Sequence, residues 1–226
     1  MTIAVIMRVN DGLVLATDSA SSVMLFDDEG NEFVYHVYNH ADKIFNLKKE
    51  NPIACMTWGA GNLSDKSIST IAKDFRKDVM KNINEFTVKE ISYKFIDYIK
   101  RIITDEDNDV GFIICGYSNK EESEDIPEVY EISYNNGELQ DPKPINEGQP
   151  IFINWYGEEQ YISRLLLGFD PYLDNIINEY DIDEENIMET IKNRLSLPLG
   201  VPSMPIQDAI EFVETLVYVT DRKSVV

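Results

Sequence analysis

Thr2 offers the combination of groups in this sequence that is best suited to covalent chemistry. It is a small residue that follows Met1, the context in which the initiator methionine is commonly removed. Removal would leave a hydroxyl and a free α-amine on one residue. An α-amine has a reference pKa of about 7.7–8.0, so it can accept a proton near neutral pH. A hydroxyl activated by the amine of its own residue is an established type of nucleophile. The alternative interpretation is that Thr2 is simply an ordinary second residue.

The segment that would position Thr2 has the pattern of a β-hairpin. Residues 3–9 (IAVIMRV) have apolar side chains on both faces of an expected strand, and residues 13–16 (LVLA) form a second apolar run. Asn10-Asp11-Gly12 between them favours a tight turn, because Asp-Gly adopts positive φ at low cost. The returning strand would bring Asp18 back to the level of Thr2.

Composition limits the classes of function open to the chain. Its 226 residues suit one domain that buries about 70–75% of the surface of the unfolded chain. The 20 Lys and Arg against 41 Asp and Glu give a formal charge of −21, which argues against binding nucleic acid or an anionic membrane through a broad basic surface. We interpret the negative charge as solvating, in a way that keeps an assembly soluble, rather than as cation-binding.

The cysteines and histidines point to no metal site and no cofactor. Cys55 and Cys115 lie in apolar runs, so we expect two buried thiols in a reducing compartment rather than a disulfide. His36 and His40 lie in a polar stretch without the ligand spacing of a zinc site. No apolar run is long enough to span a membrane and no leader pattern precedes the first strand, so we expect a cytoplasmic protein.

The remaining sequence predicts further strands and helices. A hairpin arm is expected over residues 24–40, and a capping box at Thr87–Glu90 predicts the start of a helix. Asn62 or Ser64 is expected to cap the helix before it. The other predicted elements are strands at 41–47, 53–58, 109–117, 129–134, 150–156 and 216–219, and helices at 158–167, 184–197 and 206–214.

This order of elements predicts an α+β fold. Strands that are apolar on both faces can be buried if two antiparallel sheets stack face to face with helices outside, which is a four-layer αββα sandwich. We expect residues 1–226 to form one such domain. Composition alone does not select this arrangement over other α+β folds.

Five segments occur in an order that recurs in one protein family. They are Thr2-Ile3, residues 11–19 (DGLVLATDS), residues 42–45 (DKIF), residues 59–61 (GAG) and the closing residues 209–220. Together they resemble the proteasome β subunits and their bacterial homologues, which are N-terminal-nucleophile (Ntn) hydrolases. The resemblance covers nearly the whole chain in element order, and its specific motifs lie in the N-terminal third. The spacing from Asp18 to Lys43 is longer than in the family, and the arm accounts for the excess.

The resemblance implies the αββα fold and assigns four catalytic residues. Thr2 matches the threonine nucleophile, Asp18 the carboxylate that orients a lysine, Lys43 that lysine, and Gly59 the glycine whose backbone N–H binds the oxyanion. A cation beside the Thr2 hydroxyl would stabilise its alkoxide and keep the α-amine neutral. Taken singly, Asp18 could be a turn residue, Lys43 a solvated strand lysine and Gly59 a point of chain reversal. Their joint occurrence favours the catalytic interpretation.

Two regions depart from the family pattern. The family places a Gly-Ser-Gly after the strand that here ends at Gly157, and the position of its serine, which supports the α-amine, falls at or near Tyr156. A tyrosine hydroxyl could substitute with a different geometry. The Asp and Ser that some members carry before the last strand have no clear match around Glu214-Thr215.

Three functions therefore remain open at the level of sequence. The favoured one is a threonine peptidase that works inside a ring or spiral of identical subunits, on peptides or unfolded chains, with an ATPase unfoldase as a partner that the sequence does not identify. The second is a small-molecule amidase of the same class. The third is a catalytically silent assembly subunit. The departure at Tyr156 favours the third, whereas the retention of Thr2, Asp18 and Lys43 disfavours it.

Overall fold

The structure is a computed structural model that describes residues 2–27, 29–104, 108–121, 123, 125–145, 147–170, 172–173, 194 and 203–223. Its strands are β1 (Ile3–Val9), β2 (Gly12–Thr17), β3 (Ser21–Phe26), β4 (Glu32–Tyr38), β5 (Ile44–Lys48), β6 (Ile53–Gly59), β7 (Asn62–Leu63), β8 (Lys66–Ser67), β9 (Val110–Gly116), β10 (Glu128–Asn135), β11 (Glu138–Leu139), β12 (Lys143–Pro144) and β13 (Phe152–Gly157). Its helices are α1 (Ile68–Asp78), η1 (Met80–Asn82), α2 (Val88–Ile99), α3 (Glu159–Leu167) and α6 (Ile206–Lys223).

The smaller main sheet has three antiparallel strands in the order β13-β1-β2. Pairing of β1 with β2 runs from Ala4–Thr17 to Val9–Gly12, so Asn10 and Asp11 form the predicted turn. β1 is apolar on both faces, as its sequence predicts. Ile3, Val5 and Met7 pack in a cluster with residues of α3 and α6, whereas Ala4 and Ile6 face the second sheet.

The larger sheet has the strand order β11-β10-β9-β6-β5, with β12 paired to β10. Its pairs are antiparallel throughout. Helices α1 and α2 cover one face of it, where Phe75 and Phe95 pack with Phe112 of β9. The predicted capping box is confirmed, because the Thr87 hydroxyl accepts from the Glu90 N–H and the Glu90 carboxylate accepts from the Thr87 N–H.

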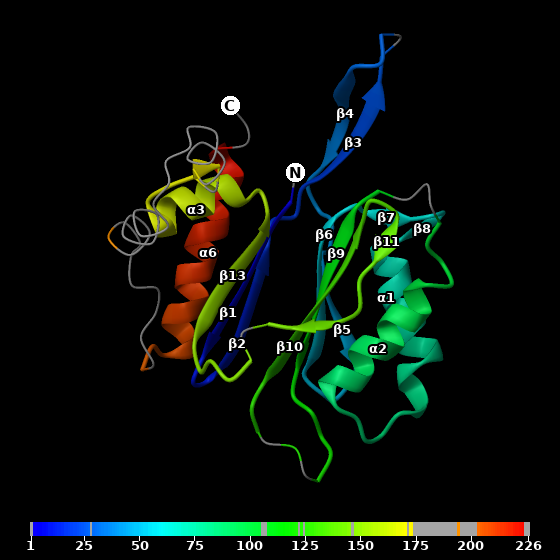
Figure 1. The fold of residues 1–226 in the computed structure, drawn as a ribbon, viewed down its shortest axis with the longest axis vertical. Coiled ribbons are helices and arrows are strands. Elements are labelled where there is room, and N and C mark those ends of the chain that lie inside the picture. Colours follow the sequence, from blue (N-terminus) through cyan, green and yellow to red (C-terminus); the bar gives the residue numbers. More distant parts are fainter. Residues whose placement is uncertain are drawn as a thin grey trace, which may run out of the picture.

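The two sheets face each other across a third apolar cluster, which includes Ile6, Met56, Ile113 and Phe152. Figure 1 shows α3 and α6 on the outer side of the smaller sheet, and α1 and α2 on the outer side of the larger one. The predicted α+β class with antiparallel sheets is thus confirmed. None of the described helices is long and apolar enough to cross a bilayer.

Strands β3 and β4 form a two-stranded sheet of their own, which projects away from both main sheets (Figure 1). This is the predicted arm, and the structure places its strands at Ser21–Phe26 and Glu32–Tyr38. Its turn is held by Asp27, whose carboxylate accepts from the backbone N–H groups of Glu29 and Asn31.

Two predictions of local structure are wrong. The strand predicted at residues 216–219 lies inside α6, where Ala209, Val213 and Leu216 are buried at helical spacing. The β-branched composition of that run resembled a strand, but the spacing of its buried residues is helical. The cap of α1 is Ser67 rather than Asn62 or Ser64, because the short β7–β8 hairpin intervenes. The helix predicted at 184–197 falls outside the described range.

Candidate active site

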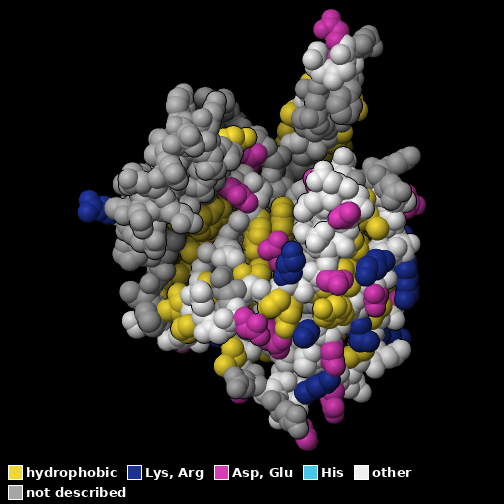
Figure 2. Space-filling model, in the orientation of Figure 1, with side chains coloured by type: hydrophobic (Ala, Val, Ile, Leu, Met, Phe, Trp, Pro, Cys, Tyr) yellow, Lys and Arg dark blue, Asp and Glu magenta, His cyan; other side chains and the backbone are white. Residues whose placement is uncertain are grey.

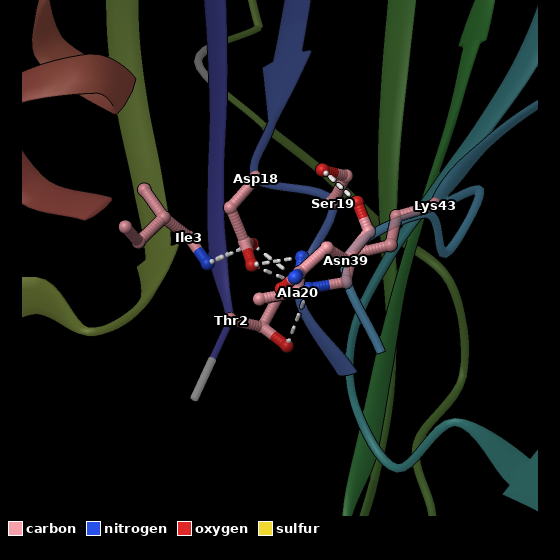
Figure 3. A network of polar contacts seen from close by, with 7 residues as sticks. All are labelled: Thr2, Ile3, Asp18, Ser19, Ala20, Asn39 and Lys43. Atoms are coloured by element: carbon pink, nitrogen blue, oxygen red, sulfur yellow. Dashed lines mark hydrogen bonds and ion pairs between the residues drawn. The ribbon is translucent and has the colours of Figure 1, made fainter. Parts of the chain in front are cut away.

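The four predicted site residues come from corresponding ends of both main sheets. Thr2 immediately precedes β1, and Asp18 immediately follows β2 in the smaller sheet. Lys43 immediately precedes β5, and Gly59 ends β6 in the larger sheet. The structure brings Thr2, Asp18 and Lys43 into one hydrogen-bonded group (Figure 3). The site is therefore assembled across the interface between the two sheets.

The Lys43 ammonium bridges Thr2 and Asp18. Its Nζ donates to Thr2 Oγ1 at 3.2 Å and to the two carboxylate oxygens of Asp18 at 2.8 and 2.9 Å. The three ammonium protons are thus all used. Thr2 Oγ1 accepts in this contact, so the hydroxyl proton stays available to a base. A positive charge at this position favours the alkoxide form of the hydroxyl.

Asp18 is held in place by the backbone as well as by Lys43. Its Oδ1 accepts from the Ile3 N–H at 2.8 Å and its Oδ2 from the Ala20 N–H at 3.0 Å. Asp18 is 6% exposed and Lys43 8% exposed, so the ion pair is buried. Such a pair is favourable only when its remaining hydrogen-bonding capacity is satisfied, and these backbone contacts satisfy it.

Lys43 and Gly59 are tied together through β6. The Thr57 N–H donates to the Lys43 carbonyl at 3.0 Å, and the Thr57 hydroxyl donates to the Gly111 carbonyl at 3.0 Å. Gly59 has φ +85°, and a Cβ there would lie 2.5 Å from the Asp109 carbonyl oxygen. Only glycine fits that backbone, since L side chains avoid this φ and the space is filled.

A cleft opens beside this group. Its volume is about 1360 Å³, and Thr2, Lys43 and Gly59 all line it. Residues at the base of the arm, from the start of β3 and the end of β4, form another part of its wall, and Ser21 and Tyr38 are among them. A substrate in the cleft therefore has access to the hydroxyl, to the ammonium and to the backbone of Gly59.

Two residues next to Thr2 were not among the predicted site residues. The Glu158 N–H donates to the Thr2 carbonyl at 2.9 Å. Gly157 has φ +86°, and a Cβ there would lie 1.8 Å from the same carbonyl oxygen. β13 thus approaches the Thr2 backbone more closely than any side chain would permit. The sequence signal for this contact is the glycine at the end of an apolar strand.

Among the described residues, the Tyr156 hydroxyl has Glu131 as a polar partner rather than Thr2. The Tyr156 ring stacks on Trp58, with centroids 4.2 Å apart and planes 20° apart, and its hydroxyl donates to Glu131 Oε2 at 3.2 Å. Burial, with a smaller contribution from the Glu131 charge, raises the pKa of the Tyr156 hydroxyl. The predicted substitution of the family serine by Tyr156 therefore has no support in the geometry. The residue of this segment bonded to Thr2 is Glu158.

Comparisons of the chain with protein-family models and with curated proteins give no match. The chemical assignment accordingly depends on the geometry of the site and on the sequence motifs that carry it. A hydroxyl, a buried cation and a fixed carboxylate, beside a cleft with an available backbone, form an arrangement suited to nucleophilic attack on a carbonyl group.

Proposed function

We propose that this protein is an N-terminal threonine hydrolase of the Ntn type, with the αββα sandwich fold, that cleaves peptide bonds as part of a self-assembled homo-oligomer. The observation that carries the proposal is the bridge from the Lys43 ammonium to Thr2 Oγ1 at 3.2 Å and to the buried Asp18 carboxylate at 2.8 Å. A lysine that is buried against an aspartate and donates its third proton to a hydroxyl can stabilise the alkoxide form of that hydroxyl, which is the nucleophile.

In the proposed reaction, removal of Met1 frees the Thr2 α-amine. Thr2 Oγ1 attacks the carbonyl carbon of the substrate while the amine takes the hydroxyl proton through a water molecule. The Gly59 N–H binds the oxyanion, a contribution of about 2.7–4 kcal/mol for comparable donors. The protonated amine then gives its proton to the leaving amine, and an acyl ester remains on Thr2. Water, activated by the same amine, hydrolyses that ester.

The size of the cleft supports a peptide as the substrate. At about 1360 Å³ it exceeds the roughly 300–1,000 Å³ that is usual for small-molecule pockets. Peptides or unfolded chains are therefore the proposed substrates, rather than small amides. The proposed setting is a ring or spiral of identical subunits in the cytoplasm, where enclosure would keep folded proteins away from Thr2.

The decisive test uses an electrophile that reacts with both groups of an N-terminal threonine. A peptide epoxyketone should add its whole mass to the wild-type protein, because the hydroxyl attacks the ketone and the amine opens the epoxide. Intact mass spectrometry reads out both the loss of Met1 and the adduct. Thr2→Ala should abolish the adduct, and Thr2→Ser, which keeps both groups, should retain it.

The competing function is a catalytically silent assembly subunit. One observation favours this function. Gly157, the last residue of β13, and Glu158, which follows it, contact the Thr2 backbone, and neither has a side-chain hydroxyl. Protein isolated from its own host with Met1 still attached would have no free Thr2 amine. That result, with no adduct on the wild type, would establish the silent subunit and reject the hydrolase.

A further inference from the structure

The arm formed by β3 and β4 carries more exposed large apolar side chains than any other element in the described part of the chain. Tyr35 is 67% exposed, Tyr38 58% and Val34 53%. The arm contributes seven of the large apolar residues that are exposed in the structure, namely Val23, Leu25, Phe33, Val34, Tyr35, Val37 and Tyr38. An exposed apolar cluster on one projecting element is typical of an interaction surface.

Both faces of the arm are apolar. Leu25 pairs with Phe33 on one face, and Val37 pairs with Ser22 on the other. Tyr35 is the extra residue of a β-bulge between these pairs. The arm projects away from the main sheets (Figure 1), and its large apolar side chains are exposed instead of packing on them. An isolated hairpin of this kind is marginally stable in water, so the arm needs a second surface to cover it.

The charge of the arm indicates the charge of the surface that would cover it. Residues 21–40 contain four Asp and Glu and no Lys or Arg, and two of the acids, Asp27 and Glu29, lie at the tip. A complementary partner is therefore expected to present positive charge. A basic surface around an apolar contact would satisfy both properties of the arm.

The same chain contains such a surface on α1 and α2. Residues 66–101 hold nine Lys and Arg against five Asp and Glu, in a chain whose formal charge is −21. Figure 2 shows Lys and Arg side chains, interspersed with Asp and Glu, over the side of the molecule that these helices form, and acidic side chains at the tip of the arm. Lys73 and Lys77 are exposed on one side of α1, and neither makes an ion pair with any described residue. Tyr93 of α2, 41% exposed, adds an aromatic surface.

From this apolar exposure and charge complementarity we infer that the β3–β4 arm of one subunit docks on the α1–α2 surface of a second copy of this chain. The two surfaces differ, so the contact is head-to-tail. Head-to-tail contacts repeat from subunit to subunit, and they produce a closed ring when the rotation closes and an open spiral when it does not. Docking also fixes the base of the arm, whose residues Ser21, Val23 and Tyr38 line the cleft beside Thr2.

The inference rests on the self-assembly that belongs to the proposed function, and it is independent of the proposed chemistry. Assembly is measured as particle mass, and reactivity of Thr2 is measured as an adduct. A loss of one with retention of the other therefore shows which proposal has failed.

The first experiment removes the aromatic groups of the arm from the full-length protein. Phe33→Ser with Tyr35→Ser should raise the dissociation constant for assembly about 100-fold or more, as expected for buried aromatic anchors. Sedimentation velocity across a concentration series measures this dissociation constant. Leu165→Ser with Tyr172→Ser is the matched control, since those side chains are 45% and 60% exposed on another part of the surface, against 44% and 67% for the arm pair.

The second experiment identifies the surface on which the arm docks. Glu29→Lys should weaken assembly, because it places a positive charge against a basic surface, and Lys77→Glu in the same chain should restore it. Lys143→Glu makes an equal charge change at an exposed position outside α1 and α2, and it should not restore assembly of the Glu29→Lys variant.

Three results would overturn the inference. A wild-type monomer at micromolar concentration would remove the self-assembly on which it rests. Unchanged assembly of the Phe33 and Tyr35 variant would show that the arm is not an interface. In the third result, Glu29→Lys weakens assembly, and Lys143→Glu restores it as well as Lys77→Glu does. That would show that net charge, rather than docking on α1 and α2, governs the contact.

Discussion

At the scale of single residues, Lys43 is required by two different properties of the protein. Its ammonium neutralises the buried Asp18 carboxylate, and its third proton meets the Thr2 hydroxyl. The first contact contributes to stability and the second to the proposed chemistry. A single substitution at Lys43 disturbs both, so a second substitution is needed to separate them.

We predict that Lys43→Met destabilises the fold by about 3–5 kcal/mol, since it leaves a buried carboxylate without its counter-ion. Adding Asp18→Asn removes that charge, and we expect the double variant to recover part of the lost free energy of unfolding. Reactivity of Thr2 toward the epoxyketone should be lost in both variants. Urea denaturation and intact mass measure the two effects, and a double variant that forms the adduct at the wild-type rate would contradict the catalytic role of Lys43.

At the scale of elements, the parts of the fold that the sequence predicts well are those with a strong local signal. The hairpin of β1 and β2 has Asp-Gly at its turn, and α2 has its capping box. The C-terminal part of α6 has no such signal, because its β-branched run is compatible with a strand until the buried partners in α3 and β1 are known. Tertiary packing decides such segments.

In the candidate site, too, the sequence predicts the residues that have local motifs and misses a contact that depends on tertiary structure. Thr2, Asp18, Lys43 and Gly59 could be predicted from motifs, and the structure brings the first three together. The contact of Glu158 with Thr2 could not, because it depends on how β13 pairs with β1 across more than 150 residues of sequence. Registers between distant strands are set by the whole sheet rather than by local pattern.

Helix α3 begins at a residue whose ionisation is unfavourable in the folded protein. Partial desolvation of its carboxyl, with the nearby Glu131 charge, raises the pKa of Glu159 above its ordinary value, although the residue as a whole is exposed. The unfolded chain therefore loses this proton at lower pH than the folded one. The contribution of Glu159 to stability is present below the unfolded pKa, near 4.3, and is lost as pH rises through the folded pKa.

We accordingly predict that Glu159→Gln raises the melting temperature at pH 7, because glutamine has no carboxyl whose charge must be desolvated. The difference between the two proteins should shrink as pH falls toward 4, where both side chains are neutral. Thermal unfolding followed by circular dichroism at pH 4, 5, 6 and 7 gives the comparison. Equal melting temperatures at pH 7 would contradict the effect of desolvation on Glu159.

At the scale of the whole molecule, the two main sheets must keep their spacing for the site to exist. Thr2 and Asp18 belong to the smaller sheet and Lys43 to the larger one, and the 3.2 Å contact between Lys43 and Thr2 crosses the interface. The apolar cluster between the sheets therefore supports the site directly, whereas the clusters under the helices support each sheet separately.

Adjacent residues of β9 permit a matched test of this dependence. Ile113 packs between the two sheets and Ile114 packs against the helices, and each is 0% exposed. Truncation of either to alanine should cost about 2–5 kcal/mol, because both leave a buried cavity. Only Ile113→Ala opens that cavity between the sheets, so only it should slow epoxyketone modification of Thr2 at a temperature where both variants are folded. If Ile114→Ala slows the reaction equally, global stability rather than the spacing of the sheets controls the reactivity of Thr2.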